Sequence, residues 1–505
     1  MRRLERVHPP LRRHGHGGAE DPRHATAHAG ELQLTPDDAD GLTGRVFARL
    51  DARLARNERA GRPEPVALAL SGGGDSVALL HLAAEWTRAK GRRLLALTVD
   101  HSLNPMSADW TRFAGETARA VGADWRALSW TEAAPGPGLT ARARAARHGL
   151  IAEAARAAGA RVVLLAHTAD DVAEADWMRA RGSTLGRVRD WSPSPVWPQG
   201  RGLMLLRPLL NERREGLRVF LRARGLGWIE DPANADARFG RSRARAALGM
   251  GLGDDLARSS VILGPVPRIQ TRDVDGSGGG VPTANGLFLD PRDKPEGGVE
   301  KKTRVAGGAL WAGVLEVSRD ASASALAAAL LCAGGGATPP RGERLAALKA
   351  RLAGGEDFTA GLAGARVEAK GARGLLMREP GEMKRHPPRP LELEPGVAAA
   401  WDGRFEITTS EPGWRVEAAA GMLARLSDAD RRVAMGLPAA ARGGLPVLVR
   451  DDAEGSLPGP ILAWRAASVQ ALGVRRLALA LDETTQETDL FHPMHGETPP
   501  TDLFS

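Results

Sequence analysis

The sequence is poor in cysteine, because only one of its 505 residues, Cys332, is of that type. A single thiol excludes a disulfide within the chain, a paired-cysteine redox motif, and a zinc or iron–sulfur site built from the cysteines of one chain. Cys332 stands in an apolar pattern with helical periodicity, so we expect it to be buried in a core. Chemistry that depends on cysteine sulfur is therefore disfavoured.

Long apolar runs are also missing. No segment stays apolar over the roughly 20 residues needed to cross a bilayer, and the first residues have no apolar core of a signal peptide. We therefore expect a cytoplasmic protein with no membrane partner. Residues 1–40 mix His, Arg, Gly and Pro without apolar periodicity, and we predict a disordered basic tail there.

Lysine is scarce and tyrosine is absent. Seven of the 69 basic residues are lysines, which leaves 62 arginines, and the net charge is +8. Arginine suits bidentate contacts to phosphate and stacking on bases, so the composition favours a polyanionic partner such as RNA. The alternative is a GC-rich coding background, which yields abundant Ala, Gly and Arg without functional meaning.

The clearest chemical signal lies between Val66 and Ser76. The apolar run Val66–Leu70 predicts a strand buried on both faces of a parallel sheet, and helical periodicity begins at Val77. The residues between them are Ser71-Gly72-Gly73-Gly74-Asp75-Ser76. Three glycines let the main chain approach an anion, and the amides at a helix start can donate to phosphate oxygens. We interpret the loop as a phosphate cradle; the alternative is an ordinary glycine turn.

This glycine loop lacks the lysine of the GxxxxGK(S/T) phosphate loop. Asp75 stands where that lysine would be. A carboxylate among phosphates is favourable when a divalent cation lies between them, so we expect Asp75 to bind Mg²⁺.

Strands and helices alternate from Val66 to about residue 250, which predicts an α/β domain with a parallel sheet over residues 41–250. A strand ending at Ala166 delivers acidic residues to the edge where such sheets bind ligands. Asp170 and Glu174 are four residues apart and share one helix face, a spacing suited to a cation or a substrate ammonium. The alternative is a charged first turn that complements the helix dipole.

Arginines gather in two places. Arg144 and Arg147 belong to a predicted helix at 140–158, and Arg241 and Arg245 belong to a cluster at 238–245. Either group could be a solvated face. Near a nucleotide site they would form an electrostatic landing surface for RNA.

The second half of the chain is predicted to be modular. Residues 251–308 are rich in Gly, Pro and Asp and read as a linker or insertion. Order returns in a small α+β module at 309–380 and a last module at 396–480, for which we expect a role in binding RNA. The tail at 481–505 is predicted to be disordered.

Several segments of the first half resemble the tRNA(Ile)-lysidine synthase family of the PP-loop (ATP-pyrophosphatase) superfamily. Ser71–Ser76 matches the superfamily signature SGGxDS, and the other segments resemble motifs of this particular family. They are Val99-Asp100-His101-Ser102-Leu103, Ala143–His148, His167–Glu174, Arg207-Pro208-Leu209-Leu210 and Asp231-Pro232-Ala233-Asn234.

The resemblance implies an adenine nucleotide alpha hydrolase-like parallel-sheet domain followed by two smaller mixed α/β modules. It implies a ligase that uses ATP and Mg²⁺ to adenylate the wobble cytidine of an isoleucine tRNA with a CAU anticodon, and then attaches free lysine. The implied catalytic residues are Asp75, Asp170, Asp171 and Glu174. The implied ATP-binding residues are Ser71, Gly72, Gly73, Gly74, Asp75 and Ser76, and the RNA-binding candidates are Arg144, Arg147, Arg241 and Arg245.

Two alternatives remain open from the sequence: another PP-loop tRNA-modifying enzyme, and a non-catalytic RNA-binding protein with a degenerate nucleotide loop. The oligomeric state is also open, with a homodimer as one option.

Overall fold

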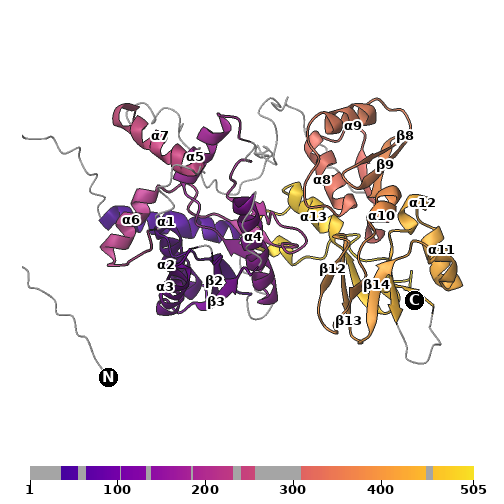
Figure 1. Cartoon of the computed structure of the whole chain (residues 1–505), viewed down its shortest axis with the longest axis horizontal. Helices are drawn as coiled ribbons and strands as arrows, with labels where there is room; N and C mark the ends of the chain where they lie inside the picture. The colour runs from indigo at the N-terminus through magenta and orange to yellow at the C-terminus, as the bar shows by residue number, and fades with distance from the viewer. Residues whose placement is uncertain are drawn as a thin grey trace, which may run out of the picture.

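The computed structural model describes residues 36–54, 64–102, 104–131, 138–183, 186–230, 240–255, 309–450 and 459–504. In Figure 1 these residues form an N-terminal unit, made of residues before 256, and a C-terminal unit, made of residues after 308. The last helix, α13 (Leu472–Ala480), belongs to the C-terminal unit and lies at the junction of the two.

The N-terminal unit is built on one six-stranded sheet with the order β3-β2-β1-β4-β6-β5. All neighbouring strands are parallel except the edge strand β5, which is antiparallel to β6. The strands are β1 Val66–Ala69, β2 Leu94–Asp100, β3 Asp124–Ser129, β4 Val162–Leu164, β5 Trp191–Pro193 and β6 Met204–Leu206. The predicted parallel-sheet α/β class is therefore confirmed.

Helices cover both faces of this sheet. They are α1 Pro36–Arg53, α2 Gly74–Ala89, α3 Ser107–Ala120, α4 Leu139–Ala157, α5 Ala169–Arg179, α6 Arg214–Ala223 and α7 Gly240–Asp255. Because side chains alternate along a strand, Leu68 of β1 packs in the core with α1, α2 and α6, whereas Ala67 packs in the core with α4. Burial on both faces explains why β1 is apolar throughout.

Helix α1 begins at Pro36, inside the segment predicted to be a disordered tail of 40 residues. The chain starts this helix with Pro36-Asp37-Asp38, and proline and acidic residues are favoured in a first helical turn. Most of the predicted tail, residues 1–35, lies outside the described residues, as do residues 256–308 of the predicted linker.

The C-terminal unit starts with an antiparallel sheet of order β7-β10-β9-β8. Its elements are β7 Leu315–Ser318, α8 Ala323–Gly334, α9 Glu343–Ala353, β8 Phe358–Leu362, β9 Ala365–Lys370, β10 Arg373–Arg378 and α10 Pro380–Arg385. Two further sheets follow, of order β11-β14-β15-β16 and β12-β13-β17. Their elements are β11 Leu391–Glu392, β12 Ala399–Trp401, β13 Phe405–Thr409, β14 Trp414–Ala418, α11 Asp428–Met435, α12 Ala439–Arg442, β15 Pro446–Arg450, β16 Ile461–Leu462 and β17 Ala467–Ala471.

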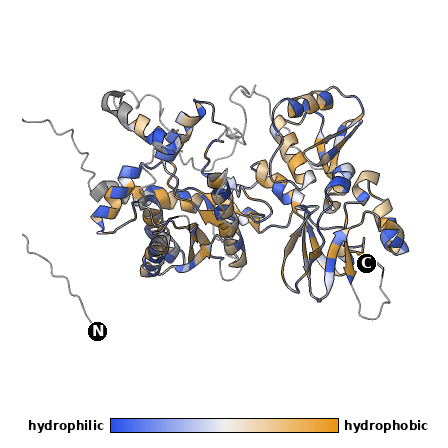
Figure 2. Cartoon of the chain, viewed as in Figure 1, coloured by the Kyte–Doolittle hydropathy of each residue, from blue (hydrophilic) through white to orange (hydrophobic). Residues whose placement is uncertain are grey.

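The two predicted modules of this unit share one hydrophobic core. Leu326 of α8 and Val367 of β9 belong to the same buried cluster as Phe405 of β13 and Val469 of β17. Figure 2 shows hydrophobic residues inside both units and hydrophilic residues on the outer helix α11. Both modules are mixed α/β, as expected, but their interiors are continuous.

Residues 481–504 are ordered, in contrast to the predicted disordered tail. Leu490 is buried in the core of the N-terminal unit, and Glu487 is buried in an ion pair with Arg92 of that unit. The tail is polar in composition, which suggested disorder. Its partners lie almost 400 residues away in the chain, so local sequence could not reveal them.

Cys332 is buried in α8, as predicted, and burial raises the pKa of its thiol to about 12. Across the part of the chain that the structure describes, every helix is too short or too polar to span a lipid bilayer.

Candidate active site

The glycine loop joins the carboxyl end of β1 to the start of α2. Helix α2 begins at Gly74, and its N-cap residue, Gly73, provides no side-chain hydrogen bond to the first amides. The hydroxyl of Ser76 donates to the carbonyl of Gly73 at 2.8 Å and lies 3.1 Å from the hydroxyl of Ser71. These bonds hold the two ends of the loop together around a helix N-terminus that can bind an anion.

A short segment after α6 packs against the glycine loop. The backbone amide of Ile229 donates to the carbonyl of Gly72 at 2.9 Å, and Gly73 and Ile229 form a parallel bridge. Gly72 has a φ of +84°, and a Cβ placed there would lie 2.5 Å from Cδ1 of Ile229. Gly72 is thus favoured by its backbone conformation, and a Cβ there would also displace the end of the Ile229 side chain. Sequence reasoning missed Ile229, because its role depends on a contact across the fold.

Asp75 is in the first turn of α2 and points toward α6. Its Oδ2 lies 3.1 Å from Nε of Arg214, the first residue of α6. Burial raises the pKa of the Asp75 carboxyl, although the Arg214 guanidinium opposes that rise.

The three predicted carboxylates of α5 approach the same guanidinium. Arg214 Nη1 lies 3.4 Å from Oε1 of Glu174, and Arg214 Nη2 lies 3.7 Å from Oδ1 of Asp171. The backbone amide of Arg214 donates to Oδ2 of Asp170 at 2.8 Å. Despite its burial, the pKa of Arg214 is raised, because Asp75, Asp171 and Glu174 stabilise its charge. The structure therefore brings all four predicted acidic residues together around one arginine.

Arg214 was missed as a site residue. It belongs to an arginine-rich stretch, Arg213 to Arg224, in which five arginines occur within twelve residues. Local sequence marks that stretch as basic but does not say which guanidinium faces the glycine loop. The position is set by the packing of α6 on α2 and by Glu212, whose carboxylate binds Arg45 and Arg49 of α1.

Positive charge lies beside these carboxylates. Partial burial lowers the pKa of Arg144 and of Arg147 on α4. The nearby positive charge of Arg241 on α7 lowers both pKa values further. Arg241 Nη1 is also 3.4 Å from Oδ1 of Asp171. Arg245 lies on the carboxylate side, with Nε 2.6 Å from Oε1 of Glu174. The four predicted RNA-binding arginines thus lie around the same site, although Arg241 and Arg245 are paired to acidic residues.

Two partly buried histidines lie close to these arginines. Burial, followed by the nearby Arg144 and Arg147, lowers the pKa of His148 to about 3. Burial and Arg207 lower the pKa of His167 to about 4, and Arg207 Nε lies 3.1 Å from Nδ1 of His167. Both imidazoles are therefore neutral at pH 7.

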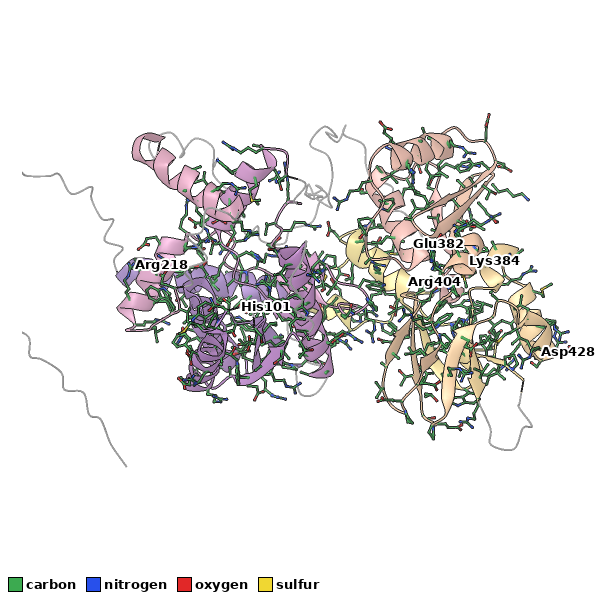
Figure 3. The ribbon with its side chains drawn as sticks, in the orientation of Figure 1. His101, Arg218, Glu382, Lys384, Arg404 and Asp428 are labelled. Carbon is green, nitrogen blue, oxygen red and sulfur yellow. The ribbon has the colours of Figure 1, made fainter. Side chains whose placement is uncertain are left out.

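His101 follows the carboxyl end of β2, and its ring makes an edge-to-face contact with Trp130, with ring centroids 5.8 Å apart. Its Nδ1 is buried and has no hydrogen-bond partner among the described residues. Burial and Arg147 lower its pKa. Figure 3 places His101 in the N-terminal unit and Arg218 on α6, whereas Glu382, Lys384, Arg404 and Asp428 lie in the C-terminal unit.

Some residues of the predicted motifs lie outside the described residues. They are Leu103, Asp231 to Asn234 and Arg238.

Comparisons with known proteins identify the family of this chain. The PP-loop domain family matches residues 48–252, which include the glycine loop, α5 and α6. The tRNA(Ile)-lysidine synthase of Caulobacter vibrioides is 42% identical over 418 residues, which cover 83% of this chain and 90% of that protein. The protein of the same name from Hyphomonas neptunium is 36% identical over 371 residues, which cover 72% of this chain and 92% of that protein.

A third relative, the tRNA(Ile)-lysidine synthase of a Bradyrhizobium species (strain BTAi1), is 44% identical over 213 residues. That match covers 41% of this chain and 59% of the relative. The first two matches extend through both units, far beyond the glycine loop that all PP-loop proteins share. On these grounds, the chain belongs to the tRNA(Ile)-lysidine synthase family.

Proposed function

We propose that this protein uses ATP to join lysine to the wobble cytidine of an isoleucine tRNA with a CAU anticodon, which gives lysidine. The observation that carries the proposal is the shared site at the carboxyl edge of the sheet. There the glycine loop and the carboxylates of α5 meet across Arg214. Family membership supplies the reaction, and this juxtaposition supplies a place for both of its steps.

In the first step, the 2-carbonyl oxygen of cytidine attacks the α-phosphorus of ATP, and the bond to pyrophosphate breaks. The amides at the start of α2 are oriented to bind the phosphates, and the hydroxyls of Ser71 and Ser76 lie beside them. Pyrophosphate leaves with the electron pair of the broken P–O bond. The cytidine oxygen now carries AMP, which makes C2 of the base electrophilic.

Mg²⁺ is proposed as the companion of ATP. Among the described residues there is no group of three His, Cys, Asp or Glu side chains that could hold a metal by itself. A single carboxylate next to a phosphate cradle fits Mg²⁺, which commonly takes one or two carboxylates together with phosphate oxygens and water. Asp75 is the residue that would hold it, and the cation would offset the charge of the phosphates.

In the second step, the ε-amine of lysine forms a bond to C2, and the C2–O bond to AMP breaks. AMP leaves with the oxygen and its electron pair, while the amine loses a proton. Glu174 is the best placed carboxylate to orient the amine, because it is only 2% exposed and its Oε2 has no partner among the described residues. Asp170 and Asp171 have structural partners that limit them to a supporting part.

The tRNA would meet the positive side chains next to this pocket. Arg144 and Arg147 are partly buried but keep solvent-exposed surface beside the edge of the sheet, so they can contact phosphates of the anticodon loop. A homodimer and a cytoplasmic location remain predictions from the sequence.

The two alternatives are less well supported. Family membership does not favour another PP-loop tRNA-modifying enzyme, and the sole cysteine is buried far from this site in α8. A degenerate, non-catalytic loop does not fit a site in which all the predicted carboxylates converge.

The test is incorporation of labelled lysine into a CAU-anticodon isoleucine tRNA by the full-length protein with ATP and Mg²⁺. We expect incorporation there and none in a methionine tRNA of the same anticodon or in an isoleucine tRNA with a GAU anticodon. The variant D75N should release AMP at least about a hundredfold more slowly, the order of loss seen when one transition-state charge contact is removed. No labelled product with any of these tRNAs would refute the proposed function.

A further inference from the structure

Arg214 lies between the carboxylate of the glycine loop and the carboxylates of α5. Its side chain reaches Asp75 through Nε, Glu174 through Nη1 and Asp171 through Nη2, at 3.1, 3.4 and 3.7 Å. No other guanidinium among the described residues contacts carboxylates from both the glycine loop and α5. Arg245 and Arg241 also pair with Glu174 and Asp171, at 2.6 and 3.4 Å. Arg214 differs from them in reaching from these carboxylates to Asp75, so a substrate ammonium placed between α5 and the glycine loop competes with Arg214.

The backbone and the side chain of Arg214 are held by separate contacts. The backbone amide is bound by Asp170, and the preceding Glu212 is held by Arg45 and Arg49 of α1. The guanidinium itself is held only by ion pairs, of which the two on α5 are longer than 3.3 Å. The shortest ion pair is the one to Asp75, next to the phosphate cradle.

A guanidinium binds phosphate in the same bidentate manner as it binds carboxylate. Because Nε of Arg214 already lies beside the first turn of α2, a phosphate bound at that turn is within reach of a small side-chain rotation. Such a rotation would remove Nη1 and Nη2 from Glu174 and Asp171. Glu174 would then be held by Arg245 through Oε1, and its Oε2, which has no partner among the described residues, could accept a substrate ammonium.

We propose that Arg214 is an internal competitor of the lysine substrate that leaves the α5 carboxylates when ATP binds, so that ATP enters before lysine. This inference rests on the proposed function, and it adds the order of binding and the residue that imposes it. The physical basis is effective concentration: a tethered cation competes at the millimolar level or above, which free lysine alone does not overcome easily. ATP lifts that competition by offering Arg214 a second anion.

The experiment measures lysine binding directly, by calorimetry or equilibrium dialysis, to the full-length protein with and without a non-hydrolysable ATP analogue and Mg²⁺. We expect the analogue to tighten lysine binding between about fivefold and 150-fold, the usual range of coupling between two sites. By reciprocity, lysine should tighten binding of the analogue by the same factor. In R214Q, lysine should bind without nucleotide as tightly as it binds the wild-type protein with nucleotide, and the coupling should vanish.

Two further variants guard against a folding artefact. R222Q removes an exposed arginine of the same helix that pairs with Glu215, and it should behave as wild type. R214K keeps the charge without the planar fork, and we expect it to retain part of the coupling. Circular dichroism spectra and thermal melts establish that each variant is folded.

The outcomes separate the inference from the proposed function. Equal lysine affinity with and without nucleotide in the wild type would overturn the inference, as would weaker lysine binding to R214Q than to wild type in both states. Either result could stand beside normal lysidine formation. Loss of lysine incorporation into tRNA together with undetectable lysine binding in every state would instead refute the proposed function.

Discussion

The three acidic residues that α5 brings to the site differ in what their oxygens already bind. Oδ2 of Asp171 accepts hydrogen bonds from the amide and the hydroxyl of Thr168, at 2.9 and 3.1 Å, and so caps its own helix. Oδ2 of Asp170 accepts from the Arg214 amide. Within the described part of the chain, Glu174 is bound only by arginines, through Oε1. The same carboxylate chemistry therefore serves three purposes: Asp171 caps a helix, Asp170 anchors the start of α6, and Glu174 is a candidate substrate contact.

The neutral histidines make stability depend on pH. His148 and His167 have folded-state pKa values of about 3 and about 4, below the ordinary 6.5 of an unfolded chain. As pH falls below about 6.5, the unfolded chain binds protons that the folded chain does not, so the free energy of unfolding falls as well. Each imidazole contributes at most about 1.4 kcal/mol per pH unit between 6.5 and its folded pKa.

We therefore predict a loss of stability between pH 6.5 and 4.5 that is smaller in H148Q than in the wild type. Urea denaturation at several pH values measures it. The exposed His386 provides the control, because H386Q should keep the wild-type slope. If the unfolding free energy of H148Q falls with pH as steeply as that of the wild type, the imidazole of His148 is not held neutral in the folded protein.

At the scale of elements, the glycine loop is shaped by the strand before it, the helix after it and the segment around Ile229. The hydroxyl of Ser76 donates a hydrogen bond to a carbonyl within the loop, whereas the amide of Ile229 donates one from a distant segment of the chain. The shape of the loop therefore depends on tertiary contacts as well as on its own sequence.

Substituting Gly72 tests this packing. We predict that G72A weakens ATP binding by about tenfold, because alanine costs roughly 1–2 kcal/mol at a φ of +84° and its Cβ would collide with Ile229 Cδ1. G91A is the matched control, since Gly91 also has a positive φ, +62°, but no atom lies within 4 Å of the point that an alanine methyl would occupy there. Binding of a fluorescent ATP analogue separates the two. Equal weakening in both variants would mean that general strain, and not the loop, is responsible.

At the scale of the whole molecule, the polar tail after α13 fastens the two units together. Thr484 accepts a hydrogen bond from the indole of Trp191 at 2.9 Å, and Asp482 pairs with Arg189. Arg92 and Glu487 form a bidentate pair at 2.6 and 2.8 Å, and both side chains are 3% exposed. The proposed RNA surface and the C-terminal unit are thus held in one arrangement.

Removing one partner of this buried pair should be costly. We predict that R92M lowers the free energy of unfolding by about 3–5 kcal/mol, because Glu487 is left buried without its counter-charge. The neighbouring Arg93 forms an ion pair with Asp124 in which both side chains are about half exposed, so R93M should cost less than about 1 kcal/mol. Chemical denaturation compares the two. The double variant R92M/E487L should recover most of the loss, and failure to recover would indicate that another contact of Arg92, such as that to the Glu64 carbonyl, dominates.

The sequence by itself determined the local features of this protein. The glycine loop, the apolar strand before it and the four-residue spacing of Asp170 and Glu174 each lie within a few residues of chain. Local backbone geometry governs such features, so they could be predicted along with the α/β class, and the family could be identified from them.

Only the tertiary structure decided which distant groups meet. Arg214 reaches Asp75 across 139 residues of chain, and Arg92 reaches Glu487 across 395. Such pairs depend on how helices and strands pack, and one arginine of a basic helix looks like another until that packing is known. The same physical reason explains why the sequence suggested a disordered tail and two separate modules. In the fold, the tail packs against the N-terminal unit, and the two modules share one core.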